Sequence, residues 1–574
     1  MKHLLKQLKA YRKESIFGPL FKLLEAGFEL LVPLLVAAMI DQGVKLGDKS
    51  VIVRMSLMMV GLGLIGLLCS VTAQYFAAKA AVGSTTRLRR ALFAHLQTLS
   101  YTELDTIGAS TMLTRLTSDM NQVQSGVNLT LRLALRSPFV VFGAMVMAFT
   151  IDVHAAAVFA IVIPILFAVV FGVMIVCIPL YRKVQARLDR VLGMTRENLT
   201  GVRVLRAFGR EEEQKREFSA RNDALTKEQN HVGRISVLLN PVTYVIINLA
   251  IVALIRTGAL RVESGALSQG DVIALYNYMS QILVELIKLA NLVLNITRAA
   301  ACCNRIGAVL EIESSQHSPQ TEPETTADAP AIEFRRAGLR YAGAGGDALD
   351  GISFRAEKGQ TIGVIGGTGS GKTTLVNLIP RFYDATEGSV LVDGVPVEQY
   401  PLESLRRRIG VVPQKAVLFH GTIRENLLWG DPDAGDGTLR EALRAAQAEE
   451  IVQGKEGGLD FEIEQGGRNL SGGQRQRLTI ARALVRKPEI LILDDSASAL
   501  DFATDAALRK ALRALPERPT VVIVSQRTSS IRHADQIIVL DNGHMVGLGT
   551  HEELLRTCEV YREIHESQYK KEER

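Results

Sequence analysis

Residues 361–374 read TIGVIGGTGSGKTT, and this stretch decides the fold of the C-terminal part of the chain. It begins with a short apolar run typical of a buried strand, and the rest satisfies the pattern G-x-x-x-x-G-K-[ST] expected between a strand and a helix. The glycines of such a loop let backbone amides approach phosphate oxygens, and the lysine reaches the β- and γ-phosphates. The stretch therefore predicts a nucleoside triphosphate site in an α/β domain, with one threonine hydroxyl offered to Mg²⁺. The loop residues concerned are Gly366, Gly367, Thr368, Gly369, Ser370, Gly371, Lys372, Thr373 and Thr374.

Two further motifs follow along the chain, and together they identify a family. The run EILILDD at 489–495 predicts a buried strand that ends in two carboxylates, of which Asp494 would hold Mg²⁺ through water. Between this strand and the phosphate loop lies LSGGQRQRL, residues 470–478, which resembles the signature motif of the ABC ATPases. Because the motifs stand in that family's order, the chain is identified as a member of it.

The resemblance implies roles for residues outside these motifs. Tyr341 resembles the aromatic residue that stacks on adenine, and Gln414 in VVPQ resembles the Q-loop residue that ligates Mg²⁺ and senses the membrane domain. Residues 498–501 match the D-loop. The resemblance also implies two such halves per working unit, with ATP sandwiched between the Walker motifs of one half and the signature of the other. The expected metal ligands are Thr373, Gln414 and Asp494. The signature residues expected to contact the partner's ATP are Leu470, Ser471, Gly472, Gly473 and Gln474.

Two positions depart from the family's hydrolytic pattern. The family usually has Glu after the Walker B Asp, where it polarises the attacking water, but this chain has Asp495, whose carboxylate is set back by about 1.5 Å. The switch-loop position that is usually His holds Gln526, which can donate a hydrogen bond but cannot carry positive charge onto the phosphoryl group. These changes predict a pocket that binds ATP but hydrolyses it poorly. Since the signature is intact, they favour a heterodimer over a homodimer.

The N-terminal part of the chain is predicted to cross a membrane. At 574 residues the chain is too long for one core, and its apolar residues crowd into the first 300 positions. Six segments are long and apolar enough to span a bilayer, which needs about 20 helical residues. They lie near residues 16–40, 55–78, 137–152, 155–179, 236–256 and 271–296.

Loop charge predicts the orientation of these spans. The stretch 182–234 carries thirteen Lys or Arg, and 79–136 is also basic, whereas 41–50, 152–154 and 257–270 are nearly balanced. Because basic loops stay inside, both termini and the ATPase domain are predicted to be cytoplasmic in the cell membrane. The two long inner connections, 82–119 and 197–218, resemble the intracellular loops of ABC exporters with their coupling helices.

Ionisable residues inside the spans leave two interpretations open. Glu25 and Glu29 lie on one helical face of the first span, and Glu285 and Lys288 lie three apart in the sixth. They are either a polar wall of a translocation cavity or internal ion pairs with side chains that snorkel to the interface.

These patterns predict a six-span α-helical membrane domain at 1–311, a linker at 312–330 and an α/β P-loop ABC ATPase domain at 331–574. The expected function is ATP-driven export of a small amphipathic substrate, with ATP and Mg²⁺ as cofactors and a second half-transporter and the lipid bilayer as partners. A siderophore-type importer and an ATP-gated sensor are the alternatives. Soluble ABC proteins that act on nucleic acid are excluded by the spans.

The predicted topology can be tested by single-cysteine labelling in intact cells, on a background that lacks the five native cysteines. Because basic loops stay inside, Glu212→Cys should react with an impermeant reagent only after permeabilisation. Glu263→Cys, in a balanced loop, should react in sealed cells. Modification of Glu212→Cys in sealed cells would overturn the orientation.

Overall fold

A computed structural model describes residues 1–326, 328–496 and 498–569 of the chain. Its internal contacts divide into two units, of which the first contains residues 1–97 and 110–312. The second contains the described residues after 312 together with 98–109. The short segment 98–109 therefore packs with the second unit, although its neighbours in sequence on both sides belong to the first.

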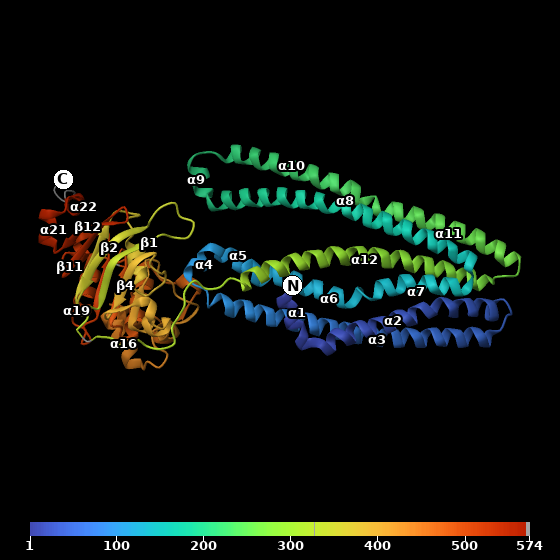
Figure 1. Ribbon diagram of the computed structural model, residues 1–574, viewed down its shortest axis with the longest axis horizontal. Coiled ribbons are helices and arrows are strands. Elements are labelled where there is room, and N and C mark those ends of the chain that lie inside the picture. Colours follow the sequence, from blue (N-terminus) through green and yellow to red (C-terminus); the bar gives the residue numbers. More distant parts are fainter. Residues whose placement is uncertain (327, 497, 570–574) are drawn as a thin grey trace. The chain divides into compact units, whose positions relative to one another are not determined.

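The first unit consists of long helices (Figure 1). Among the described residues, six helical segments are long and apolar enough to cross a membrane. They run over Lys2–Val44, Lys49–Leu96, Ala109–Ile151, Val153–Thr200, Glu211–Glu263 and Gln269–Leu310. The six spans predicted from hydropathy are confirmed, and the chain is a multi-pass membrane protein. Each segment has 42 to 53 residues, about twice the length that a bilayer requires.

Caps and small side chains define these helices and their packing. Asp48 starts the second segment by accepting hydrogen bonds from the backbone amides of Ser50 and Val51. Asp152 starts the fourth and also pairs with Arg261 at 2.6 Å. The main helices are α2 (Arg12–Ala38), α3 (Lys49–Leu96), α6 (Met120–Leu133), α7 (Arg136–Ile151), α8 (Val153–Thr200), α10 (Glu211–Val237), α11 (Leu239–Glu263) and α12 (Gln269–Leu310).

The helices α2 and α3 lie side by side because small residues let their backbones approach closely (Figure 1). Ala73 and Ala77 are fully buried there. A Cβ added to Gly18 would stand 3.4 Å from the backbone nitrogen of Ala77. In contrast, large apolar side chains such as Leu68 are 68% exposed, which suits contact with lipid.

A cluster of charged side chains joins α2, α7 and α12 inside this unit. Arg136 on α7 donates from one guanidinium nitrogen to Glu285 on α12 and from the other, at 2.6 Å, to Glu29 on α2. Glu285 also accepts from Ser137 and Lys288, each at 2.8 Å. We call these five residues the Arg136 cluster. Glu285 and Lys288 therefore form an ion pair, as one of the two interpretations of the sequence expected. The side chains of Glu29 and Lys288 are each 42% exposed.

The second unit contains two main sheets in its described part. A six-stranded sheet has the order β12-β11-β3-β10-β9-β6, in which all neighbours are parallel except β11 and β12. Its strands are β3 (Thr361–Gly366), β6 (Ile409–Val412), β9 (Ile490–Asp494), β10 (Thr520–Val524), β11 (Gln536–Asp541) and β12 (His544–Gly549). An antiparallel sheet of order β2-β1-β4-β5 contains β1 (Ile332–Leu339), β2 (Leu349–Ala356), β4 (Glu387–Val392) and β5 (Val395–Pro396).

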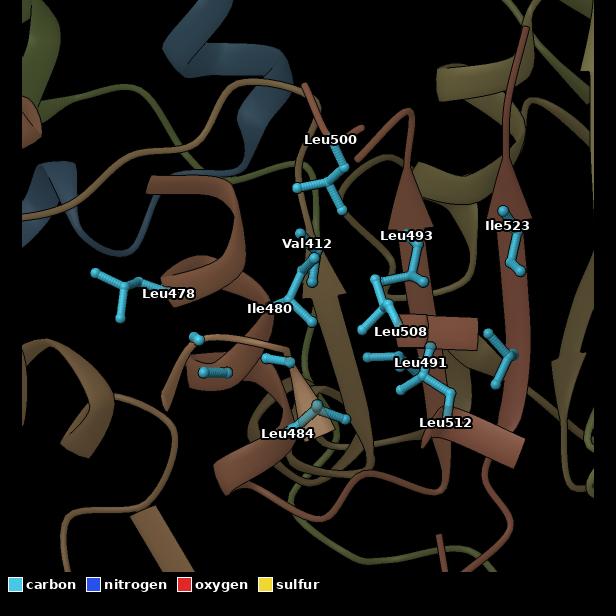
Figure 2. Close-up of a cluster of buried hydrophobic side chains, with 14 of the residues drawn as sticks. Val412, Leu478, Ile480, Leu484, Leu491, Leu493, Leu500, Leu508, Leu512 and Ile523 are labelled. Carbon is cyan, nitrogen blue, oxygen red and sulfur yellow. The ribbon is translucent and has the colours of Figure 1, made fainter. Parts of the chain in front are cut away.

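Helices pack on the parallel sheet through a continuous apolar core. Figure 2 shows side chains from α18 (Gly472–Val485) and α19 (Phe502–Arg513) directed at the strands β6, β9 and β10. Leu491 and Ile480 in this core are fully buried. Because both faces of a parallel sheet are covered, its strands are nearly uniform runs of Ile, Val and Leu. The predicted fold class, a six-span helical domain with an α/β P-loop ATPase domain, is confirmed.

The Arg136 cluster should contribute strongly to stability. Arg136→Met removes one partner of the buried Glu285 and leaves Lys288 and Ser137, so the loss should stay below the roughly 3–5 kcal/mol expected when a buried charge loses its only partner. We expect a clearly lower Tm in detergent. The control Lys215→Met removes an exposed ion pair with Glu212 and should not change the Tm. Equal melting of the two variants would contradict a stabilising role for the cluster.

Candidate nucleotide-binding site

Four parallel strands bring the predicted site residues to one edge of the sheet. The phosphate loop follows β3, Gln526 follows β10 by two residues, Asp494 ends β9, and Gln414 follows β6 by two residues. Because these strands are neighbours and all parallel, their carboxyl ends meet at the same edge. In open α/β sheets this edge is where ligands bind.

At two positions, the backbone of the phosphate loop has a left-handed conformation that favours glycine. Gly369 and Gly371 have φ values of +83° and +94°, in the left-handed region. A Cβ on Gly371 would also stand 2.7 Å from the carbonyl oxygen of Ala348. The helix α13 (Lys372–Leu378) begins directly after this glycine.

Lys372 lies folded over the loop. Its Nζ donates to the carbonyl oxygens of Gly367 at 2.6 Å and Gly366 at 3.0 Å, and the side chain is almost fully buried. Burial lowers the pKa of Lys372, while the nearby carboxylates Asp495 and Asp494 oppose this change. The close partners of the Lys372 ammonium named above are neutral carbonyl oxygens, and a bound phosphate would place a negative charge next to it.

Oxygen ligands for a hard cation stand beside the lysine. The hydroxyl of Thr373 donates to Asp494 at 3.2 Å, so that a hydroxyl and a carboxylate oxygen are neighbours at the start of α13 and the end of β9. Burial raises the pKa of Asp494. A divalent cation bound there would lower that pKa again, and Mg²⁺ prefers such oxygen donors. These residues fit the predicted metal.

Asp495 is held by the two glutamines that the sequence singled out. Its Oδ2 accepts from Nε2 of Gln414 at 3.4 Å and from Nε2 of Gln526 at 3.5 Å. Its backbone is left-handed, with a φ of +45°. Burial raises its pKa, and the hydrogen bond from Gln414 partly offsets this. The two positions that depart from the family pattern are therefore in direct contact.

The site residues surround a cavity of about 530 Å³ within the second unit. It is lined by Tyr341, Asp347, Ala348, Thr368, Gly369, Gly371, Lys372, Thr373, Thr374, Gln414, Asp494, Asp495, Val524, Gln526, Asn542 and Gly543. Sequence reasoning missed five of these lining residues: Asp347, Ala348, Val524, Asn542 and Gly543. The last two have a signal in the sequence Asp-Asn-Gly at 541–543, which is typical of a tight hairpin turn and lies between β11 and β12.

Tyr341 lies just beyond the end of β1, at the rim of this cavity. Its hydroxyl donates to Thr374 Oγ1 at 3.1 Å. Its ring forms a T-shaped pair with that of Tyr383, with centroids 5.1 Å apart and planes at 88°.

The signature residues lie elsewhere in the unit. Ser471 caps α18, and its side chain and that of Gln474 each bind the other's backbone amide. Leu470 is buried in the core, whereas Ser471 and Gly472 are exposed. None of the five signature residues lines the cavity described above. Within one chain, the structure therefore does not bring the signature to the phosphate loop.

Comparisons with known proteins agree with this site. The family described as the ABC transporter transmembrane region matches residues 15–286, and the family described as ABC transporter matches residues 349–498. An uncharacterised ABC transporter ATP-binding protein of Mycobacterium tuberculosis is 38% identical over 98% of this chain and 97% of its own length. The chain belongs to the ABC transporters. It joins one transmembrane region and one ATPase domain, as in an ATP-hydrolysing half-transporter.

Other relatives extend the likeness. YfiB of Bacillus subtilis, also an uncharacterised ABC transporter ATP-binding protein, is 36% identical over 100% of this chain and 99% of that protein. The ATP-dependent lipid A-core flippase of Chromobacterium violaceum is 30% identical over 99% of this chain and 97% of its length. The structure of a bacterial Atm1-family ABC exporter with ATP bound has the same fold, with a TM-score of 0.82 at 23% identity, over 98% of this chain and 100% of that one.

The phosphate loop can be tested by nucleotide binding to the full chain. Lys372→Ala should strongly weaken binding of labelled ATP, because the cation that faces the phosphates is lost. Tyr341→Ala should weaken it by about 1–3 kcal/mol through loss of stacking on the base. Unchanged ATP binding in Lys372→Ala would show that the loop is wrongly assigned.

Proposed function

We propose that this chain is one half of a heterodimeric ABC exporter, and that the pocket on its own Walker motifs binds ATP but hydrolyses it slowly. In this half-transporter, the membrane domain comprises residues 1–311, the linker 312–330 and the nucleotide-binding domain 331–574. Both termini and the ATPase domain lie in the cytoplasm, as the basic loops favour.

The observation that carries the proposal is the contact of Asp495 with Gln414 and Gln526. A catalytic carboxylate must reach the attacking water, and Asp495 is shorter than the usual Glu by about 1.5 Å. It is also already engaged by two amide donors. Gln526 is neutral, so it supplies no positive charge to the phosphoryl group in the transition state. A misplacement of this size is poorly tolerated in catalysis.

The signature motif supports the second half of the proposal. Ser471 and Gly472 are exposed at the start of α18, the end of a helix where backbone amides can receive an anion. The signature sequence there matches the family pattern in full, whereas the chain's own catalytic positions, Asp495 and Gln526, depart from it. A partner with Glu and His at the matching positions would form a competent pocket against this motif. A homodimer would have two weak pockets.

The residues present fit ATP and Mg²⁺. Lys372 and the loop amides would hold the phosphates, Tyr341 would stack on the adenine, and Thr373, Gln414 and Asp494 would hold the metal directly or through water. Bound Mg²⁺ neutralises phosphate charge and orients the terminal phosphate. The chain's own contribution is to fix the phosphates and to exclude water on the sheet side of the cavity.

The proposed substrate is a small amphipathic or lipid-like molecule that leaves the cytoplasmic side. Two relatives are named ATP-dependent lipid A-core flippases, and a lipid-like substrate for this chain is proposed by analogy with that name. In this chain, the half-exposed ends of Glu29 and Lys288 give the membrane unit a polar patch between apolar helices. Such intramembrane charges are costly and typically line a pathway.

The two pockets can be separated by mutating each half of the assembled pair. Ser471→Ala should abolish ATP hydrolysis, because this residue would face the partner's ATP. Asp495→Ala should change it little, since the chain's own pocket contributes little turnover. Alone, the chain should bind ATP yet hydrolyse it about 100- to 1,000-fold more slowly than the pair, as expected from losing about 3–4 kcal/mol of transition-state stabilisation.

The measurement is the ATPase rate of the purified pair with each substitution in turn. Thr550→Ala, which removes the helix cap at the start of α21 (His551–Thr557), serves as a folding control through its effect on Tm. If Asp495→Ala stops hydrolysis while Ser471→Ala is tolerated, the roles of the two pockets are reversed and the heterodimer proposal fails.

A further inference from the structure

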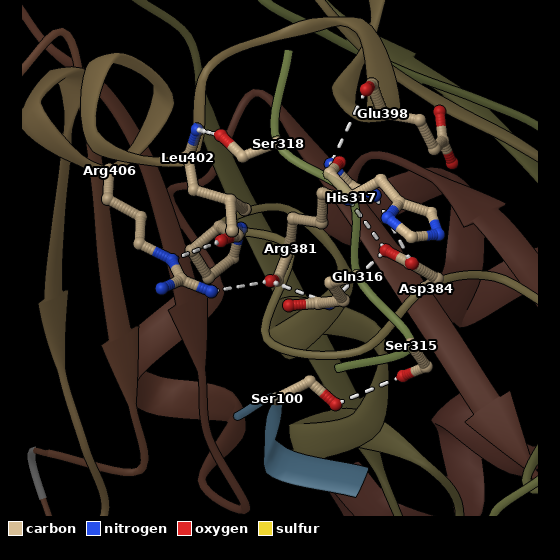
Figure 3. Close-up of polar contacts among 11 residues, drawn as sticks. Ser100, Ser315, Gln316, His317, Ser318, Arg381, Asp384, Glu398, Leu402 and Arg406 are labelled. Atoms are coloured by element: carbon tan, nitrogen blue, oxygen red, sulfur yellow. Dashed lines mark hydrogen bonds and ion pairs between the residues drawn. The ribbon is translucent and has the colours of Figure 1, made fainter. Parts of the chain in front are cut away.

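The turn Arg381–Asp384 receives contacts from four separate parts of the second unit. Figure 3 shows the linker residues Ser315–Ser318 lying against it, with Ser100 bonded to Ser315. Gln316 donates to the carbonyl oxygen of Arg381 at 3.2 Å, and Arg406 donates to the same oxygen at 2.8 Å. The helix α4 (Tyr101–Ile107) and the rim residue Tyr341 contact the same turn through its aromatic side chains.

The turn itself is held rigidly. Arg381 is only 3% exposed and has a left-handed φ of +52°, which is unusual for a residue with a Cβ. Its guanidinium binds Asp384 at 2.7 Å and the carbonyl oxygen of His317 at 3.0 Å. These contacts anchor the backbone beside Phe382 and Tyr383, whose side chains extend from the turn.

These two side chains receive α4. Tyr101 packs on Phe382 with ring centroids 4.9 Å apart. The hydroxyl of Tyr383 donates to Asp105 Oδ2 at 2.6 Å. Burial, followed by Asp105, raises the pKa of Tyr383, so the phenol stays protonated and can donate at any physiological pH. In sequence, α4 lies between the membrane helices α3 and α5 (Ala109–Thr114).

On its other side, Tyr383 supports the residue proposed to stack on adenine. Its ring meets the Tyr341 ring edge to face, a geometry that aromatic pairs favour. The tip of Tyr341 is fixed by Thr374 at the start of α13. Two contacts therefore set the plane of the Tyr341 ring, and one of them depends on where Tyr383 stands.

We propose that Tyr383 is a positioning residue for Tyr341, and that its hydrogen bond to Asp105 makes the affinity for ATP depend on the docking of α4. This inference rests on the proposed ATP site. With the bond in place, both rings are ordered before the base arrives. Without it, binding of the base must also order them, which weakens binding.

The test compares MgATP with inorganic tripolyphosphate, which has no base, on the full chain in lipid nanodiscs. Tyr383→Phe keeps the ring but removes the bond to Asp105. It should weaken MgATP about 2- to 10-fold, the range for one hydrogen bond, and leave tripolyphosphate unchanged. Asp105→Ala should do the same. The double variant should equal either single variant, because one bond is removed in all three.

Tyr400→Phe is the matched control. It removes a buried tyrosine hydroxyl that donates to Val392 in the same unit but does not touch the site. It should leave both affinities unchanged. Lys372→Ala should weaken both ligands, and if it weakens neither, the proposed ATP site fails independently of Tyr383.

Three results would overturn the inference while leaving the ATP site intact. The first is unchanged MgATP affinity in Tyr383→Phe. The second is an equal loss for tripolyphosphate, which would mark a general structural defect. The third is additive effects of Tyr383→Phe and Asp105→Ala. Tyr383→Ala, which also removes the ring behind Tyr341, should weaken MgATP more than Tyr383→Phe.

Discussion

The parallel pairing of β3, β10, β9 and β6 is the constraint on which the nucleotide site depends. In its register Val524 stands opposite both Val364 and Asp494, so the three strands end almost level. The backbone amide of Asp495 then bonds to the carbonyl oxygen of Val524, and that of Ser525 to Val364. Every loop that leaves this edge starts from a position fixed by backbone hydrogen bonds. The phosphate loop, the acidic residues Asp494 and Asp495 and the glutamines Gln414 and Gln526 lie close together because the strands that carry them all end at this edge.

A second constraint acts on the membrane unit, where a charge without a partner is expensive. Arg136 is balanced by Glu285 and Glu29, and Glu285 in turn by Lys288. The cluster has equal numbers of positive and negative charges, and its most buried charged members, Arg136 and Glu285, bond to each other. This arrangement fixes α7 against α12 and leaves charged atoms of both signs at the exposed ends of the cluster. One set of residues can therefore join helices and present polar groups to a substrate.

The sequence predicted those features that local pattern encodes. Hydropathy located the six spans, and the spacing of glycines and lysine located the phosphate loop, because each signal lies within some twenty residues. Contacts between distant residues were not visible in the same way. Glu285 and Lys288 are three apart and could be paired from sequence, whereas the partner Arg136 lies 149 positions away. The lining residues Asn542 and Gly543 were missed for a related reason, since a hairpin turn does not show which site it borders.

The placement of 98–109 shows most clearly what sequence reasoning cannot supply. The pattern of this segment predicted a helical intracellular loop, and its own residues say nothing about what it contacts. The structure joins it to the second unit through Tyr101 and Asp105, which meet Phe382 and Tyr383. A tyrosine is suited to this position because its ring and its hydroxyl can bind different partners. The ring of Tyr383 touches Tyr341 while its hydroxyl binds α4, so one side chain belongs to both contacts. In a pocket that binds ATP but hydrolyses it slowly, as we propose, a contact that changes the affinity for ATP has more effect than one that changes the rate of hydrolysis. A link from α4 to the adenine base, instead of to the attacking water, acts on the affinity for ATP and is consistent with this comparison.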